Sequence, residues 1–138
     1  MFELDLKGRK SIYEQVMDNF KEQILLDIIS ADQQLPSVRE LSKELTVNPN
    51  TIQKAYRELE RQGYIYTVAG KGTFASAKES IGPDERLIAD VKARLLDDVK
   101  ELFYLFPEED DVKKIVNEAI NETIKIFADG KSEVKQDD

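Results

Sequence analysis

Apolar residues recur at helical spacing along most of this chain, and this spacing constrains its fold more than any other feature. In the first part of the chain they follow one another every four residues, at Ile12, Val16, Phe20, Ile24 and Ile28. That period places them on one face of an amphipathic helix, which we expect to begin after Ser11 and to end near Ile28 or Ile29. The chain is therefore predicted to be mostly helical.

Two shorter helices follow, joined by a turn of about three residues. The first is expected over residues 36–45, where Ser37 and Glu40 have the spacing of a capping box. The second is expected over residues 49–62, because Asn48 before it is a good N-cap and a proline occupies its first position. Their proximity predicts a compact pair of helices.

The remaining elements are a hairpin and two longer helices. Two β-prone runs, at 64–67 and 73–75, flank a glycine-containing tip, which predicts a small β-hairpin. After a small, polar linker, two apolar stripes predict an antiparallel pair of helices. The fold class is mostly α with a small β-hairpin. The expected divisions are residues 1–77, a linker at 78–83, a two-helix region at 84–129 and a disordered tail at 130–138.

The two stripes are too wide for the two helices to bury against each other alone. They need a further partner, either the first part of the chain or a second copy. We expect a dimer interface there. Its predicted members are Ile88, Val91, Leu95, Val99, Leu102, Phe106, Val112, Ile115, Ile120 and Ile124.

Composition excludes several classes of function. The chain contains no cysteine and no histidine, which removes disulfides, thiolate chemistry and the commonest general base and metal ligand. No paired carboxylates or nucleophile–base pair can be recognised, so we expect neither an enzyme nor a metal or cofactor. The acidic run at 108–111 is better explained by a helix N-terminus than by a cation site. Without a membrane span or a basic leader, a cytoplasmic location is expected.

The negative charge is unevenly distributed. The net charge is −8, and residues 78–138 hold 10 basic and 17 acidic residues, against 10 and 11 in residues 1–77. Residues 36–77 alone hold 6 basic and 4 acidic residues. The mildly basic stretch therefore coincides with the short helices and the hairpin, and an acidic second half would face away from a nucleic acid.

Two short helices with a tight turn are typical of a helix-turn-helix, whose second helix enters the DNA major groove with its N-terminus first. Amide, hydroxyl and ammonium groups at that position can bond bases and phosphates. The hairpin tip carries a cation between glycines that allow a close backbone approach. The candidate DNA-binding residues are Asn48, Asn50, Thr51, Gln53, Lys54, Gly70, Lys71 and Gly72.

Simpler interpretations compete with this one. Short helices with a hairpin also occur in structural domains, and a winged helix can serve as a protein-interaction module without specific DNA binding. Arg39 could be a surface residue paired with Glu40 or Glu44, and the hairpin tip could be a generic turn. Binding that falls steeply with salt would distinguish DNA recognition from these alternatives.

Five blocks of sequence, in order and at fixed spacing, resemble the winged helix-turn-helix of the GntR family of bacterial transcription regulators. They read LPSVREL, VNPNTI, AYRELE, GYI and GKGTF, at residues 35–41, 47–52, 55–60, 63–65 and 70–74. The resemblance implies DNA contacts from Ser37 and Arg39, together with the residues at 50, 51, 53 and 54 and the tip at 70–72. It places helix 49–62 in the major groove of a palindromic operator.

The VNPNT block and the short two-helix tail resemble the YtrA subfamily. This implies a dimeric repressor of its own operon, often alongside an ABC-type transporter. Asp27, Ala31 and Asp32 stand where the family usually has Gly and then Pro-Gly, which leaves open the form of the turn before the second helix. Val68 and Ala69 replace the usual arginine of the wing. An unknown small-molecule effector, if there is one, would have to bind between protomers.

Overall fold

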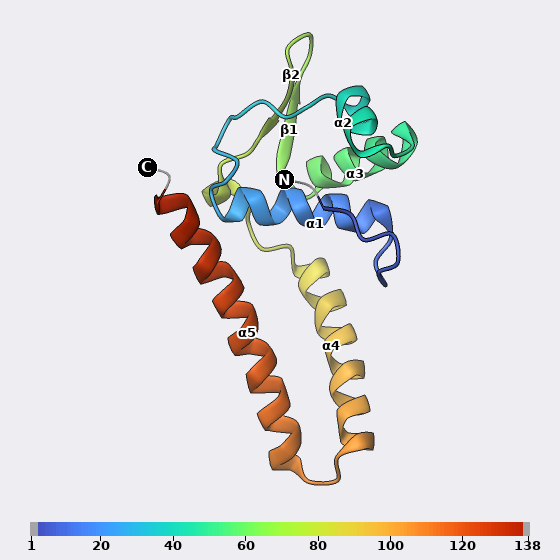
Figure 1. Cartoon of the computed structure of the whole chain (residues 1–138), viewed down its shortest axis with the longest axis vertical. Helices are drawn as coiled ribbons and strands as arrows, with labels where there is room; N and C mark the ends of the chain where they lie inside the picture. Colours follow the sequence, from blue (N-terminus) through green and yellow to red (C-terminus); the bar gives the residue numbers. More distant parts are fainter. Residues whose placement is uncertain (1–2, 137–138) are drawn as a thin grey trace. The chain divides into compact units, whose positions relative to one another are not determined.

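The structure is a computed structural model that describes residues 3–136, and it divides the chain into two compact units, Met1–Gly82 and Pro83–Asp138. The first unit contains α1 (Ile12–Leu25), α2 (Val38–Leu45), α3 (Pro49–Arg61), β1 (Ile65–Val68), β2 (Gly72–Ala75) and the short 3-10 helix η1 (Lys78–Ser80). The second contains α4 (Glu85–Leu105) and α5 (Glu109–Gln136) (Figure 1). The mostly helical fold with one small hairpin is confirmed.

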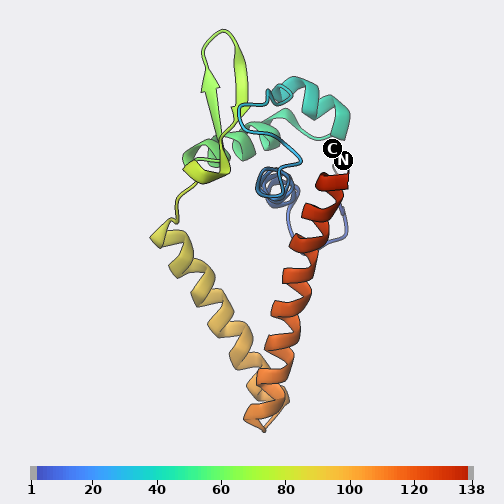
Figure 2. The ribbon, with the colours of Figure 1, turned by 90° about the vertical axis from the view of Figure 1, so that its left-hand side faces the viewer.

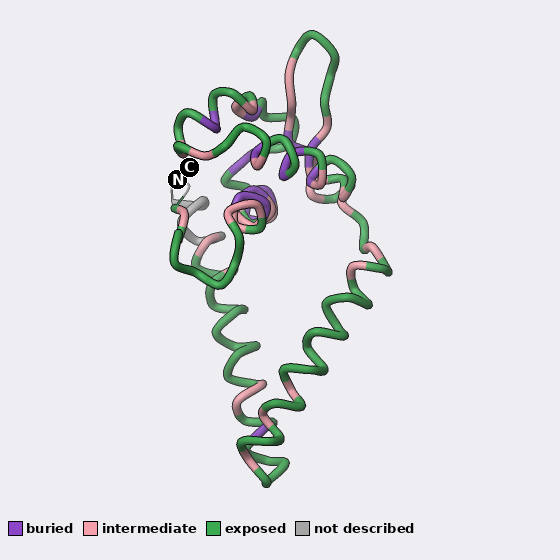
Figure 3. Tube along the Cα trace, turned by 90° about the vertical axis from the view of Figure 1, so that its right-hand side faces the viewer, coloured by how far each residue is buried: buried purple, intermediate pink, exposed green. Residues whose placement is uncertain are grey.

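The core of the first unit forms where α1 packs against α3. The rings of Phe20 and Tyr56 meet edge to face, with centroids 5.5 Å apart. Figure 3 shows most of the buried residues in this unit, on α1 and the elements around it. The largest fully buried side chains are Phe20, Ile24, Leu41, Ile52, Leu59 and Val16.

Helix α1 ends earlier than its apolar period predicted. Its last residue is Leu25, and Asp27 adopts a left-handed backbone with φ of 59°. The backbone N–H groups of Ile28 and Ile29 both donate to the carbonyl of Gln23, which is how a left-handed residue closes a helix. Ile28 is consequently 51% exposed rather than part of the buried face. The predicted end near Ile28 or Ile29 is therefore wrong.

The hairpin is extended by the loop that connects α1 with α2. Strands β1 and β2 are antiparallel, with Ile65 opposite Ala75. The N–H of Asp32 donates to the carbonyl of Ala75 (2.8 Å), the N–H of Ala75 to Gln33 (2.9 Å), and the N–H of Leu35 to Thr73 (2.8 Å). Figure 1 shows this loop passing beside β2 on its way to α2. The loop thus pairs with β2 through these bonds and an isolated bridge between Gln34 and Phe74, although the sheet itself keeps two strands. The sequence pattern did not predict this pairing.

The second unit buries almost nothing within one copy of the chain. Helices α4 and α5 meet at the turn 106–108 and diverge from it (Figures 1 and 2). Of residues 83–130, whose burial is described, only Val112 is buried. Leu95 and Ile124 are 55% and 59% exposed. Two helices arranged in this way leave their apolar stripes in solvent.

Helix α5 continues through Gly130 to Gln136, although the sequence predicted an end before that glycine and a disordered tail at 130–138. A glycine inside a helix costs only about 1 kcal/mol, and the lysines and glutamate that follow favour helix. The predicted helix end before Gly130 is therefore wrong, and the disordered tail stays a prediction. Residues 137 and 138 lie outside the described part. No helix within that part is long and apolar enough to span a membrane.

Candidate nucleic-acid interface

The turn between α2 and α3 is fixed by backbone and side-chain hydrogen bonds. Thr46 ends α2 in a left-handed conformation with φ of 54°. The hydroxyl of Ser42, a buried residue, donates to the carbonyl of Val47 (2.6 Å), and the N–H of Val47 donates back to the carbonyl of Ser42 (3.1 Å). These bonds hold the short turn rigidly, so the start of α3 has a defined position relative to α2.

The start of α2 carries the predicted capping box. The Oγ of Ser37 accepts from the N–H of Glu40 (3.1 Å), and the carboxylate of Glu40 accepts from the N–H of Ser37 (3.3 Å). The hydroxyl proton of Ser37 remains available to a phosphate. Arg39 is exposed and takes part in none of the ion pairs found among the described residues. The interpretation that pairs it with Glu40 or Glu44 therefore finds no support.

The start of α3 exposes the polar residues that the sequence singled out. The Oδ1 of Asn48 caps the helix by accepting from the N–H of Asn50 (2.8 Å), so the side-chain amide N–H groups of Asn48 are left to bond other partners. Asn50, Gln53 and Lys54 are exposed, and Thr51 is half-buried. The opposite face is buried through Ile52, Ala55, Tyr56 and Leu59.

The hairpin tip is built around two glycines with positive φ. Gly70 has φ of 75°, and the N–H of Lys71 donates to the carbonyl of Val68 (3.0 Å), which closes the turn. Gly72 has φ of 128°, and a Cβ built there would lie 2.6 Å from the Nε2 of Gln34. The backbone conformation favours glycine here, and a Cβ would also displace the end of the Gln34 side chain. The Lys71 side chain is exposed.

Two parts of the candidate interface come together in one cleft. The start of α2 and the tip end of β2 line a cleft with a volume of about 490 Å³. Its lining residues are Gln34, Leu35, Pro36, Ser37, Val38, Glu40, Gly72 and Thr73. Ser37 and Gly72, 35 positions apart in sequence, therefore line the same feature. Gln34 was not predicted as part of the interface, because a polar loop residue gives no periodic or motif signal.

In the segment between α1 and α2, two aspartates adopt a left-handed backbone conformation. Asp27 and Asp32 have φ of 59° and 64°. The ammonium of Lys78 pairs with the carboxylate of Asp27 (2.6 Å), and the hydroxyl of Tyr66 donates to that of Asp32 (2.6 Å). Aspartate is among the few residues other than glycine that adopt this conformation. The turn thus needs no glycine at either position.

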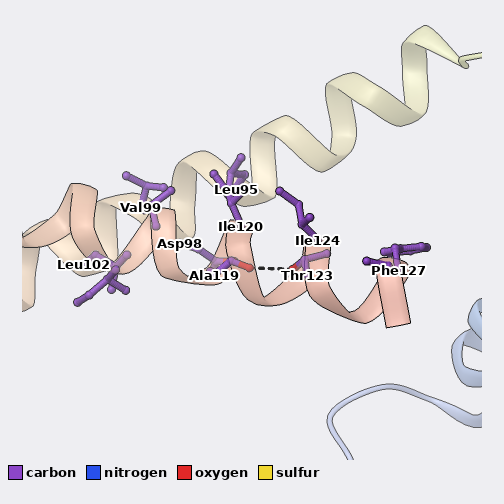
Figure 4. A pocket seen from close by; sticks show the side chains of 12 residues that line it. Leu95, Asp98, Val99, Leu102, Ala119, Ile120, Thr123, Ile124 and Phe127 are labelled. Atoms are coloured by element: carbon purple, nitrogen blue, oxygen red, sulfur yellow. Dashed lines mark hydrogen bonds between the residues drawn. The ribbon is translucent and has the colours of Figure 1, made fainter. Parts of the chain in front are cut away.

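Six of the ten predicted dimer residues line an apolar groove between α4 and α5, with a volume of about 750 Å³ (Figure 4). The groove contains Leu95, Val99, Leu102, Ile115, Ile120 and Ile124 of the predicted set. Val116, Ala119, Thr123 and Phe127 also line it. Ile88, Val91 and Phe106 do not line it, and Val112 lines a smaller cleft near the turn. The described residues contain no cluster of acidic groups able to hold a metal ion.

A family model and individual relatives both match this chain. The model of the gntR family of bacterial regulatory proteins matches residues 12–75. The HTH-type transcriptional repressor YtrA of Bacillus subtilis is 46% identical over 76 residues, which are 55% of this chain and 58% of YtrA. The uncharacterised HTH-type transcriptional regulator YhcF of the same organism is 36% identical over 124 residues, covering 90% of this chain and 95% of YhcF.

A solved structure extends the similarity to most of the chain. The crystal structure of a transcriptional antiterminator from Listeria monocytogenes EGD-e matches with a TM-score of 0.75 and 34% identity. The match covers 86% of this chain and 89% of that one. These relatives are regulators of transcription, which agrees with the expectation that the chain is not an enzyme.

Proposed function

The chain belongs to the gntR family of bacterial regulatory proteins, and we propose that it is a dimeric repressor that reads a palindromic operator. The observation that carries the proposal is the exposed start of α3. It presents amide and ammonium groups without any acidic residue in its first turn, while its other face is buried in the core. The recognition helix of a helix-turn-helix meets base edges with this part of its surface.

Each polar residue of the interface has a distinct part in this proposal. Asn50 and Gln53 lie in the major groove, where their amides pair best with adenine. Lys54 and Arg39 neutralise phosphates, and the α2 N-terminus beside Ser37 adds backbone N–H groups. A-T base pairs are therefore expected in the half-site. Asn48 and Thr51 contact the DNA at the start of α3, and Gly70, Lys71 and Gly72 contact it from the wing.

A second copy of the chain would cover the groove of the second unit. The groove is lined almost entirely by apolar side chains, and such a surface is rarely left in solvent. Two modules on a shared base would read two half-sites about one helical turn apart, as symmetric regulators do. This proposal makes the second unit the dimer interface. An effector, if one exists, would bind between protomers.

The likeness to YtrA extends the proposal to the genes under control, which we infer to be its own operon and an ABC-type transporter. An unbiased experiment comes first: selection of random duplex DNA by the purified protein at about 0.1 M salt, which already weakens non-specific binding. We expect an enriched inverted repeat. Asn50→Ala should relax base preference at one position of each half-site, whereas Glu60→Ala, late in α3, should change nothing.

The alternative function, a winged helix that binds a protein, predicts a different result. Selection would then enrich no sequence, and any residual binding would be independent of base sequence. Specific binding to the repeat should fall with salt with a log–log slope of about −0.9 for each phosphate contacted. A slope near zero, or no enrichment, would contradict the proposed function.

A further inference from the structure

The tip of the hairpin is held by a side chain from outside the hairpin. The Nε2 of Gln34, in the loop before α2, donates to the backbone carbonyl of Lys71 over 3.1 Å. The two residues are 37 positions apart in sequence. This contact joins the loop that precedes the α2 cap to the turn at the far end of the wing.

Both backbone polar groups of Lys71 are thereby bonded. Its N–H donates to Val68 within the turn, and its carbonyl accepts from Gln34. Gly72, the next residue, lies so close to Gln34 that a Cβ would meet the Nε2 at 2.6 Å. The backbone of Lys71 is thus fixed on two sides, while its ammonium extends from an exposed residue.

The rest of the hairpin gives the tip little support. Each strand has four residues, and an isolated two-stranded hairpin of this size is marginally stable. The backbone pairing with the loop reaches only as far as Thr73, through the N–H of Leu35. Apart from its two chain neighbours, nothing lies within 4 Å of a Cβ built on Gly70. The Gln34 side chain therefore extends the contact between loop and hairpin from Thr73 to Lys71, in the turn itself.

We propose that Gln34 is the positioning residue of the wing: its side-chain amide fixes the Lys71 carbonyl, so that the Lys71 ammonium is presented to DNA at a defined distance from α2 and α3. This inference rests on the proposed function and deepens it. It concerns a wing in which Lys71 is the single cation between residues 64 and 77. Because the wing has only this one cation, the orientation of its tip determines how much the wing contributes to DNA binding.

A double-mutant cycle tests the coupling. Affinity for the selected duplex is measured at fixed salt for the wild type, Gln34→Met, Lys71→Ala and the double variant. Methionine keeps the length of the side chain and removes its N–H donor. We expect Lys71→Ala to weaken binding about fivefold in the wild type, as for an exposed ion pair. In the Gln34→Met background the same change should cost less than about twofold, near the limit of additivity.

A readout without DNA separates positioning from a general loss of stability. The backbone order parameter at Gly70 and Lys71 should fall from about 0.85 to below about 0.6 in Gln34→Met. Gln33→Ala is the matched control, because the Gln33 side chain accepts from the N–H of Ser30, a residue outside the wing. It should leave the order parameters, the melting temperature and the DNA affinity unchanged.

The outcomes distinguish this inference from the proposed function. If Lys71→Ala weakens binding equally in both backgrounds, or if wing order is unchanged in Gln34→Met, Gln34 does not position the wing. If Lys71→Ala has no effect in the wild type, the wing makes no contact, and the inference is overturned while recognition by α3 stands. If no duplex is enriched, both fail together, and the selection shows this before any variant is made.

Discussion

The hydroxyl of Tyr56, in the middle of α3, donates a hydrogen bond of 2.6 Å to the carbonyl oxygen of Pro36, just before the cap of α2. The residue is buried, and this burial raises the pKa of the Tyr56 hydroxyl well above its ordinary value of 10. It therefore keeps its proton at any physiological pH. The bond connects α3 to the segment that carries Ser37 and Arg39, so that two parts of the candidate interface share one anchor.

Tyr56→Phe removes this anchor and leaves the Pro36 carbonyl without its donor. We expect the free energy of unfolding to fall by about 1 kcal/mol, the net worth of a typical hydrogen bond. Urea denaturation measures the change. Tyr66→Phe is the control, because its bond to Asp32 lies at an exposed site where water can replace it. An equal loss in both variants would show that burial of the Tyr56 bond adds nothing.

The free energy of unfolding is expected to depend on pH through Glu58. The guanidinium of Arg61, together with the side-chain amide of Gln62, lowers the pKa of the Glu58 carboxyl from 4.5 to about 2. The unfolded chain binds this proton more tightly, so the contribution of Glu58 is present above pH 4.5 and is lost as the pH falls towards 2. Urea unfolding from pH 6 to 2.5 should show a smaller acid loss in Glu58→Gln than in the wild type. Parallel curves would contradict this.

Two substitutions at Asp27 are expected to differ in their effect on stability. Both Asp27→Gly and Asp27→Ala remove the carboxylate that pairs with Lys78. Only glycine adopts the φ of 59° without the clash of a Cβ with the carbonyl, which costs about 1–2 kcal/mol in an L-residue. Asp27→Gly should therefore unfold at higher urea than Asp27→Ala. Equal midpoints would mean that the turn changes its backbone rather than bearing the strain.

The same residues show how far sequence reasoning reaches. The capping box at Ser37 and the cap at Asn48 were predicted and are confirmed, because each depends on residues within one helical turn. The early end of α1 was not predicted, since the apolar period runs on through Ile28 while the backbone reverses at Asp27. Helix caps can be predicted from neighbouring residues, but no sequence pattern shows that a given aspartate adopts the left-handed conformation.

Contacts between segments that are distant in sequence could not be predicted either. The pairing of loop 32–35 with β2 and the bond from Gln34 to Lys71 are tertiary contacts, and neither segment has a pattern that indicates its partner. Candidate DNA-binding residues were easier to find, since they occupy fixed offsets in a motif. Their support from Tyr56 and Gln34 becomes visible only when the chain is folded.

Substitution of Arg39 is expected to lower the affinity for DNA without lowering the stability of the fold. The side chain is exposed and belongs to none of the ion pairs among the described residues, so Arg39→Ala should leave urea unfolding unchanged. Binding to the selected duplex should weaken by more than about 1 kcal/mol, as for a charged hydrogen bond. Lys43→Ala, a cation in the last turn of α2, serves as the control. Equal effects would indicate general electrostatic attraction rather than a placed contact.

Leu95 and Leu96 allow a matched test of the groove as the dimer interface. They are adjacent on α4 and 55% and 54% exposed, but Leu95 lines the groove and Leu96 does not. An aspartate at 95 would be desolvated by a second copy, which costs far more than the same charge in water. Leu95→Asp should therefore be monomeric in sedimentation equilibrium and should lose binding to the inverted repeat, while Leu96→Asp remains dimeric and binds. A dimeric Leu95→Asp protein with normal affinity would place the interface elsewhere, because the charge would then have met no partner surface.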